Sequence, residues 1–486
     1  MGYIGNAPYQ GVLTGGNIQD GTVETTDLAN GAVTTVKLGD GQVTAGKLAA
    51  TLDLTGKTVT LPAGVGGHAS GTEANRPASP AIGTIYFNTD EDTLQQYTSA
   101  GWLDVGSVSL SISTISGTIF NSTSTTLTIA GAGFGLSATV RFAYGGSNSD
   151  VAVTPDSDNQ ITVLVPSGAY GQSAGTTISI SVIANGRVSN AASKTVISLP
   201  TGGTITSSGG YRIHTFNSSS NFVIPSGATL SNVEYLIIAG GAGGGIQHGG
   251  GGGAGGYRSS VPGESSGGGA VAEQRLSLSA ATYSVVVGSG GAGVITNVNG
   301  NDGLNSSFNS IIAVGGGGGS SMEGTSTMVA SSGGSGGGAA LPNSGPSTTG
   351  QGGLGTTGQG YGGGDFTGYT GTNYGGGAGG GGAGGVGQNT PHYTGSIYKA
   401  GDGGVGIASS ITGSSVARAG GGGGGSHSPF IYGSGGSGVG GRGGLGNDEA
   451  GQNAVQFTGG GGGGSGFANG VGGNGADGVV IIRYQL

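Results

Sequence analysis

Blocks of consecutive glycine are the feature that most restricts how this chain can fold. Glycine supplies 122 of the 486 residues, and its densest blocks span 240–245, 249–256, 315–319, 375–385, 420–425 and 459–464. Such a block can be a slack random coil or polyglycine II, a left-handed helix with three residues per turn and no internal hydrogen bonds. In polyglycine II the N–H and C=O groups must pair with neighbouring helices, and only glycine lets backbones approach closely on every side.

Strand-like segments lie between and around these glycine blocks. They span 211–216, 221–224, 233–239, 282–287, 308–314 and 478–484. Because the blocks recur between strands and are not confined to one domain boundary, we expect an ordered bundle of polyglycine helices anchored by a sheet. A slack linker is the alternative.

Composition excludes several classes of function. There are 14 basic and 23 acidic side chains, a net charge of −9, and no segment collects lysine or arginine, so we expect no nucleic-acid partner. The absence of cysteine excludes disulfides and thiol catalysis. The five histidines are scattered, so neither a metal site nor a cofactor is expected. We also expect no membrane insertion and no secretion signal, because the longest apolar stretches are short.

A ten-residue repeat occupies residues 18–48. Each repeat supplies a valine and a leucine at matching positions, which is too little to enclose a core, so neighbouring chains must cover these side chains. We therefore expect a stalk of parallel identical chains around a threefold axis, a homotrimer. A flexible linker is the alternative. The predicted oligomerisation residues are Val23, Leu28, Val33, Leu38, Val43 and Leu48.

A predicted β-hairpin follows the repeats. Residues 83–88 form a β-rich alternating run, 89–92 a polar turn, and 93–97 a return strand towards Trp102. The first 105 residues resemble the shaft of bacteriophage tail fibres: decads with Thr-x-x-Leu spacing precede Arg-Pro, Gly-x-Ile-Tyr-Phe-Asn-Thr, Tyr and Trp in that order.

The next predicted domain is a β-sandwich, with strands at 126–129, 139–144, 160–165 and 177–183. Its motifs Ala-Gly-Ala-Gly-Phe at 130–134, Val-x-Phe at 140–142 and Ile-Thr-Val-x-Val-Pro at 161–166 resemble IPT/TIG immunoglobulin-like domains. That resemblance implies a spacer or a weak ligand holder.

The remaining chain resembles the glycine-rich terminal domains of phage tail proteins. The similarity rests on Tyr-x-x-His-x-Phe at 211–216, Val-Glu-Tyr-Leu-Ile-Ile-Ala-Gly-Gly at 233–241 and Gly-Val-Val-Ile-Ile-Arg-Tyr at 478–484. We therefore predict an all-β, multidomain and elongated chain. Its parts would be a tail-attachment segment and stalk at 1–60, a β-hairpin collar at 61–106, an Ig-like sandwich at 107–200, and a glycine-rich receptor-binding tip at 201–486.

Aromatic residues between the glycine blocks are the candidate binding site. They stand among Gly, Thr, Asn and Ser, the residue types of antibody paratopes, in which tyrosine gives rigid contact area at low entropic cost. If the blocks form a bundle, these segments become its turns and gather at one end. The alternative role is to cap the bundle hydrophobically. The candidates are Tyr361, Phe366, Tyr369, Tyr374, Tyr393, Tyr398, Phe430 and Tyr432.

Catalytic motifs are weak. The acidic clusters at 90–92, 156–158 and 448–449 could supply a glycosidase pair, but each lies in a turn-like segment where solvated carboxylates are common. Residues 472–479 fit one copy of a calcium-binding nonapeptide that functions only in tandem. We therefore expect a protein that is not an enzyme.

The resemblance to tail fibres implies a phage receptor-binding protein, synthesised in the host cytoplasm and carried in the virion. Its N-terminus would attach to the tail, baseplate or an adaptor protein. Its C-terminal tip would bind a host glycan or outer-membrane protein. The alternatives are a non-catalytic virion whisker or decoration protein and a capsular polysaccharide depolymerase.

Overall fold

The computed structural model describes residues 69–90, 93–99, 101–105, 109–322, 329–341, 349–367, 375–390, 392–394, 397–426, 430–468 and 470–485. The regular secondary structure of these residues is almost entirely β, in several sheets, which confirms the predicted all-β, multidomain class. The chain divides between Gly106 and Ser107 into two compact units. The six predicted stalk residues lie outside the described part of the chain.

The first unit is a four-stranded sheet in the order β1-β2-β3-β4. Its elements are β1 (Ala69–Gly71), η5 (Glu73–Asn75), β2 (Ile85–Asn88), β3 (Thr93–Thr98) and β4 (Gly101–Asp104). β2 and β3 form the predicted antiparallel hairpin, in which Phe87 lies opposite Leu94. Trp102 lies in β4 opposite Tyr97.

The second unit begins with a β-sandwich. One sheet has the order β10-β7-β5, and the other has the order β6-β13-β11-β8-β9 with β12 paired to β11. Its elements are β5 (Ser111–Ser116), β6 (Ile119–Phe120), β7 (Thr126–Ala132), β8 (Ala138–Tyr144), β9 (Ser147–Val153), β10 (Gln160–Leu164), α1 (Ser167–Tyr170), β11 (Thr177–Ala184), β12 (Arg187–Val188) and β13 (Ala192–Ile197).

Alternating side chains of both sheets form the core of the sandwich. Leu127 and Ile129 of β7 pack in one cluster with Val140 and Phe142 of β8 and with Phe134. This alternation is the period of two expected for strands with one buried face. The four predicted strands of this domain are confirmed as β7, β8, β10 and β11.

A larger sheet follows, in the order β14-β15-β25-β16-β18-β19-β20 with β17 paired to β16. Its strands are β14 (Thr204–Ser208), β15 (Tyr211–Phe216), β16 (Ser220–Ile238), β17 (Tyr257–Ser259), β18 (Leu276–Val286), β19 (Ser306–Phe308), β20 (Ile311–Ala313) and β25 (Val479–Gln485). Two short hairpins complete the described strands: β21 (His392–Thr394) with β22 (Ile397–Lys399), and β23 (Ile407–Ser409) with β24 (Val416–Arg418).

The centre of this larger sheet is buried on both faces. Tyr235 and Ile237 of β16 pack into one cluster, whereas Leu236 and Ile238 pack into another. The first cluster also contains Phe120 of the sandwich, so the two domains share apolar contacts. Continuous apolar runs are typical of strands covered on both faces.

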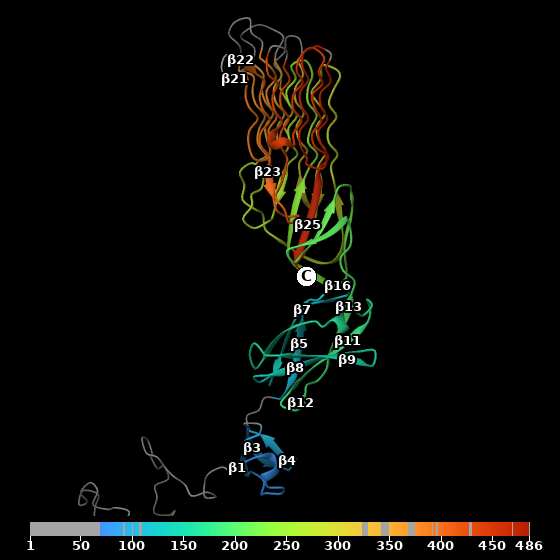
Figure 1. The fold of residues 1–486 in the computed structure, drawn as a ribbon, viewed down its shortest axis with the longest axis vertical. Helices are drawn as coiled ribbons and strands as arrows, with labels where there is room; N and C mark the ends of the chain where they lie inside the picture. Colours follow the sequence, from blue (N-terminus) through green and yellow to red (C-terminus); the bar gives the residue numbers. More distant parts are fainter. Residues whose placement is uncertain are drawn as a thin grey trace, which may run out of the picture. The chain divides into compact units, whose positions relative to one another are not determined.

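Glycine runs extend from the ends of strands on one side of this sheet, such as the end of β16 and the beginning of β25 (Figure 1). The run 249–256 shows how they pair. Its N–H groups donate to three other runs in rotation, at 2.7–3.2 Å. Residues 249, 252 and 255 donate to the run 459–465. Residues 250, 253 and 256 donate to the run 314–320, and residues 251 and 254 donate to the run 378–381. Its carbonyls accept bonds from runs 239–245, 335–338 and 422–425. A repeat of three residues with six neighbours is the pattern expected of packed polyglycine II helices.

We call this assembly of hydrogen-bonded glycine runs the lattice. At most glycines of the lattice, an added β-carbon would meet a carbonyl group of a neighbouring run. A Cβ on Gly251 would overlap the carbonyl oxygen of Gly422, and one on Gly250 would overlap that of Gly338. Glycine is therefore required here for close approach between backbones. The ordered bundle predicted from the sequence agrees with this arrangement.

Outer runs of the lattice lack a neighbour on one side, and side-chain oxygens take its place. Asp302 Oδ1 accepts from Gly318 N at 2.8 Å, and Asn305 Oδ1 accepts from Gly315 N at 2.8 Å. Asp477 and Asn474 do the same for Gly290 and Gly293. The acceptors are three residues apart in each pair, which matches the three-residue repeat.

We predict that Asp302→Ala lowers the free energy of unfolding by about 1–2 kcal/mol, because the buried Gly318 N–H loses its acceptor. Asp302→Asn is the matched control, since its amide oxygen can still accept, and we expect a much smaller change. Urea unfolding of both variants measures the difference. Equal stability of the two variants would contradict a capping role for this side chain.

Candidate functional site

Turns of the lattice alternate between two ends. The run 239–245 leaves β16, the chain turns at 246–248, and the run 249–256 returns antiparallel to it and enters β17. The turn 246–248 therefore lies at the end opposite the sheet. We call this the distal end; in Figure 1 the hairpin β21–β22 lies there, and β25 lies at the other end.

Contacts between described turns assemble the distal end. Ser321 Oγ accepts from Ile246 N at 2.8 Å and donates to Val298 O at 2.6 Å, which joins the turn 246–248 to the turn 295–299. The His248 and Phe467 rings stack with centroids 4.9 Å apart. Segments far apart in the sequence thus form one continuous surface.

One part of the distal end is apolar and exposed. Ile295 is 75% exposed, Val298 56%, and Phe467 and Val471 39% each. Beneath them Ile246, Val294 and Met322 are buried. Exposed apolar side chains that gather on a rigid support are typical of contact surfaces for other molecules.

The other part of the distal end is aromatic and charged. The Tyr398 and Phe430 rings meet edge to face with centroids 5.5 Å apart. The Arg442 guanidinium lies over the Tyr432 ring, 4.5 Å from its centroid, and forms a 2.7 Å ion pair with Glu449. The hydrogen bond from Arg442 holds the pKa of the Glu449 carboxyl below its usual value.

A shallow groove of about 670 Å³ lies beside this ion pair. Arg442, Glu449, Gln452, Asn453 and Asn474 supply its polar lining. The Oδ1 atoms of Asn453 and Asn474 accept from backbone N–H groups, so these amides are fixed in place. The groove is suited to polar ligands.

The structure brings only some of the predicted aromatic residues together. Tyr398, Phe430 and Tyr432 lie at the distal end, and Tyr393 lies opposite Tyr398 in the β21–β22 hairpin. Tyr369 and Tyr374 lie outside the described residues.

Two predicted residues are not part of the exposed distal surface. Phe366 is 1% exposed and packs with Ala339, Leu341 and Ala378, so its ring fills the lattice as in the capping alternative. Tyr361 begins a run just after the turn 356–359, and its hydroxyl lies near Gly269 of the loop that follows β17, at the sheet end. The expected gathering at one end is therefore wrong for Tyr361, because its turn joins two runs at the opposite end.

Sequence reasoning missed the apolar part of the distal end. Ile295, Val298 and Val471 are aliphatic, and His248 and Phe467 are single rings beside glycine blocks, so a search for tyrosine-rich segments passes over them. The available signal was an apolar residue in a short turn between two glycine-rich runs.

The acidic residues singled out in the sequence form hydrogen bonds within the described part of the chain. No group of three or more His, Asp or Glu side chains in the described part is arranged to hold a metal ion. Asp477 lies in the segment that fits one copy of a calcium-binding nonapeptide, and its Oδ1 accepts from Gly290 N at 2.8 Å. Asp156 accepts from Thr162 and Asp158 from Gly135 N, so these carboxylates fix turns.

No described helix is long and apolar enough to cross a membrane.

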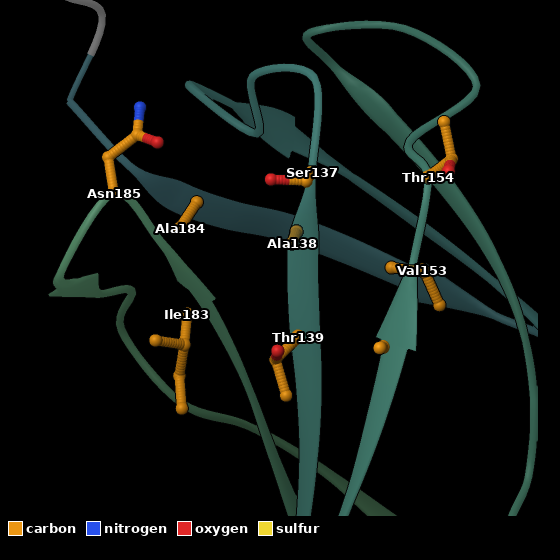
Figure 2. Close-up of a pocket in the computed structure, with 9 residues that line it drawn as sticks. Ser137, Ala138, Thr139, Val153, Thr154, Ile183, Ala184 and Asn185 are labelled. Carbon is orange, nitrogen blue, oxygen red and sulfur yellow. The ribbon is translucent and has the colours of Figure 1, made fainter. Parts of the chain in front are cut away.

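A second hollow of about 610 Å³ lies in the sandwich at the ends of β8, β9 and β11. Figure 2 shows its lining, in which Ser137, Thr139, Thr154 and Asn185 supply the polar side chains. None of its lining residues is charged, so it lacks the groups needed for acid–base chemistry.

Comparison with known proteins assigns the largest part of the chain. No curated protein matches the sequence. Residues 214–485 match the family described as glycine-rich domain. The matched residues include the lattice and most of the sheet that anchors it. The chain therefore belongs to the glycine-rich domain family.

Proposed function

We propose that this protein is a phage tail fibre that attaches to the virion tail through its N-terminal segment and binds a receptor on the host surface through the distal end. The observation that carries the proposal is the distal end itself, where exposed Ile295, Val298 and Phe467 and the Tyr398–Phe430 pair lie at the same end of a hydrogen-bonded lattice. A rigid support lowers the entropic cost of binding, because the contact residues are already in place.

The proposed partners follow from this arrangement. An outer-membrane protein loop would suit the apolar part, and a surface glycan would suit the polar groove beside Arg442 and Glu449. Three copies in a homotrimer would convert weak contacts into avidity. The sequence resemblances add support: the decads and the Arg-Pro hairpin resemble the shaft of tail fibres, and the glycine-rich tip resembles terminal domains of phage tail proteins.

We predict that the double substitution Ile295→Asn and Val298→Asn lowers the adsorption of phage carrying this fibre by at least about tenfold. Both side chains are exposed in one turn, so their replacement removes apolar contact area while the lattice stays folded. Val271→Asn is the matched control, because Val271 is 82% exposed but lies beyond the lattice in the loop after β17.

Adsorption counts on host cells, with circular dichroism to verify folding, measure the effect. Unchanged adsorption by all folded variants, together with unchanged adsorption after Tyr398→Ala and Phe430→Ala, would contradict the proposal and favour a decoration protein. Release of reducing sugars from the host capsule would instead favour a depolymerase.

A further inference from the structure

The sheet of the first unit has two different faces. On one face lie Tyr86, Gln95 and Trp102, and the segment that contains η5 packs over them. Arg76 Nη1 donates to Gln95 Oε1 at 2.7 Å, and Trp102 Nε1 donates to Pro77 O at 3.0 Å. The Arg76 guanidinium also lies 5.8 Å from the Trp102 ring centroid. This face is covered by the chain's own residues.

The opposite face follows from the strand register. Phe87 lies opposite Leu94, Ile85 lies opposite Gln96, and Gln96 lies opposite Leu103. Successive residues of a strand point to opposite faces, so these side chains share the face turned away from Trp102. We call it the apolar face; its apolar residues are Ile85, Phe87, Leu94, Leu103 and Val105, and Ser70, Gln96 and Thr98 are its polar members.

The described part of the chain covers the apolar face only in part, since Ile85, Phe87 and Leu94 are half-buried. Leu103 is 54% exposed and Val105 45%, and no buried hydrophobic cluster of the described residues includes any of its members. Tyr86 is the one apolar side chain that is fully buried in the described residues of this unit.

We propose that the apolar face packs against the same face of two further copies of this chain around a threefold axis. The inference rests on the trimer of the proposed function and assigns a surface to it. The ten-residue repeats at 18–48 lie just before the sheet, and parallel chains joined there would bring three identical sheets together at high effective concentration. The apolar face carries no charged residue, so contact with copies of itself buries no unpaired charge.

Single cysteines in the full-length chain test the proposal, because the natural sequence contains none. Leu103→Cys places a thiol on the apolar face. Ala74→Cys is the matched control, since Ala74 is exposed in η5 on the covering segment of the other face. Light scattering gives the native mass, a maleimide gives the reaction rate of each thiol, and a short bis-maleimide tests whether two chains can be joined.

We expect a native mass of three chains, a thiol at position 103 that reacts at least about tenfold more slowly than the thiol at position 74, and covalent joining of chains through position 103. Adding Phe87→Asp and Leu94→Asp to the Leu103→Cys chain should raise its reaction rate towards that of the control, because charged residues would separate the faces.

Three results would overturn the inference. One is a native mass of a single chain. The second is a multimer in which the thiols at positions 103 and 74 react equally fast, which would place the interface elsewhere. The third is a slow thiol at position 103 that never joins two chains, which would show that the chain's own residues cover the face. Host adsorption measured on the same samples tests the proposed function separately, because a single chain that still adsorbs refutes only the trimer.

Discussion

Replacing Gly251 by alanine is expected to destabilise the centre of the lattice by about 3 kcal/mol or more. The added β-carbon would overlap the carbonyl oxygen of Gly422, and both residues lie in runs bonded on several sides. Relief would require the runs to move apart, which would break N–H···O bonds such as that from Gly251 to Ala378 at 3.0 Å. We expect faster hydrogen exchange of residues 249–256 and their neighbouring runs.

Gly362→Ala is the matched control for this substitution. Gly362 also lies in a glycine run, but the nearest atom to its added β-carbon is Gly353 O at 3.2 Å, so a small adjustment accommodates the methyl group. We expect a change in the free energy of unfolding below about 1 kcal/mol. Equal effects of the two substitutions would show that general loss of glycine flexibility, and not close backbone approach, determines stability here.

Much of the sheet framework could be predicted because its strands carry apolar patterns. The segment expected at 211–216 is β15, and the runs at 233–239 and 478–484 form the buried parts of β16 and β25. β14 was missed because all five of its residues are exposed, and all but Ile205 are polar. β17 was missed because three residues beside a glycine block carry too short a pattern.

The neighbours of each glycine run could not be predicted. Glycine has no side chain, so a block carries no periodicity that distinguishes one partner run from another. The order of the runs depends on which carbonyl reaches which N–H across the whole domain, as in the six neighbours of residues 249–256. The direction of each run decides at which end its turns lie, and this separates Tyr361 from Tyr398 although both stand beside glycine blocks.

The second large effect is expected from acid, through His214. This side chain is buried in the sheet, where Nδ1 donates to Gly202 O at 2.8 Å and Nε2 faces the Tyr484 hydroxyl at 3.2 Å. A carbonyl can only accept, so Nδ1 carries the proton and Nε2 accepts from Tyr484 in the neutral ring. Burial lowers the pKa of His214 from 6.5 to about 4, the Gly202 carbonyl opposes this shift, and the nearby Arg212 charge adds to it.

This pKa difference predicts how stability changes with pH. Between pH 6.5 and about 4 the unfolded chain binds a proton at this residue that the folded chain does not, so folding weakens as pH falls through that window. Above pH 6.5 this residue should not reduce the free energy of unfolding. Near pH 4 the free energy of unfolding should be lower by about 3 kcal/mol because of this residue. Urea unfolding at a series of pH values, monitored by circular dichroism, measures this decrease.

His214→Phe is the control, because it keeps a ring beside Phe222 and Tyr484 but cannot titrate. Carboxylates titrate equally in both proteins, so parallel pH curves for the two would refute the role of His214, whereas a flatter curve for the variant would establish that this one ring carries the acid sensitivity.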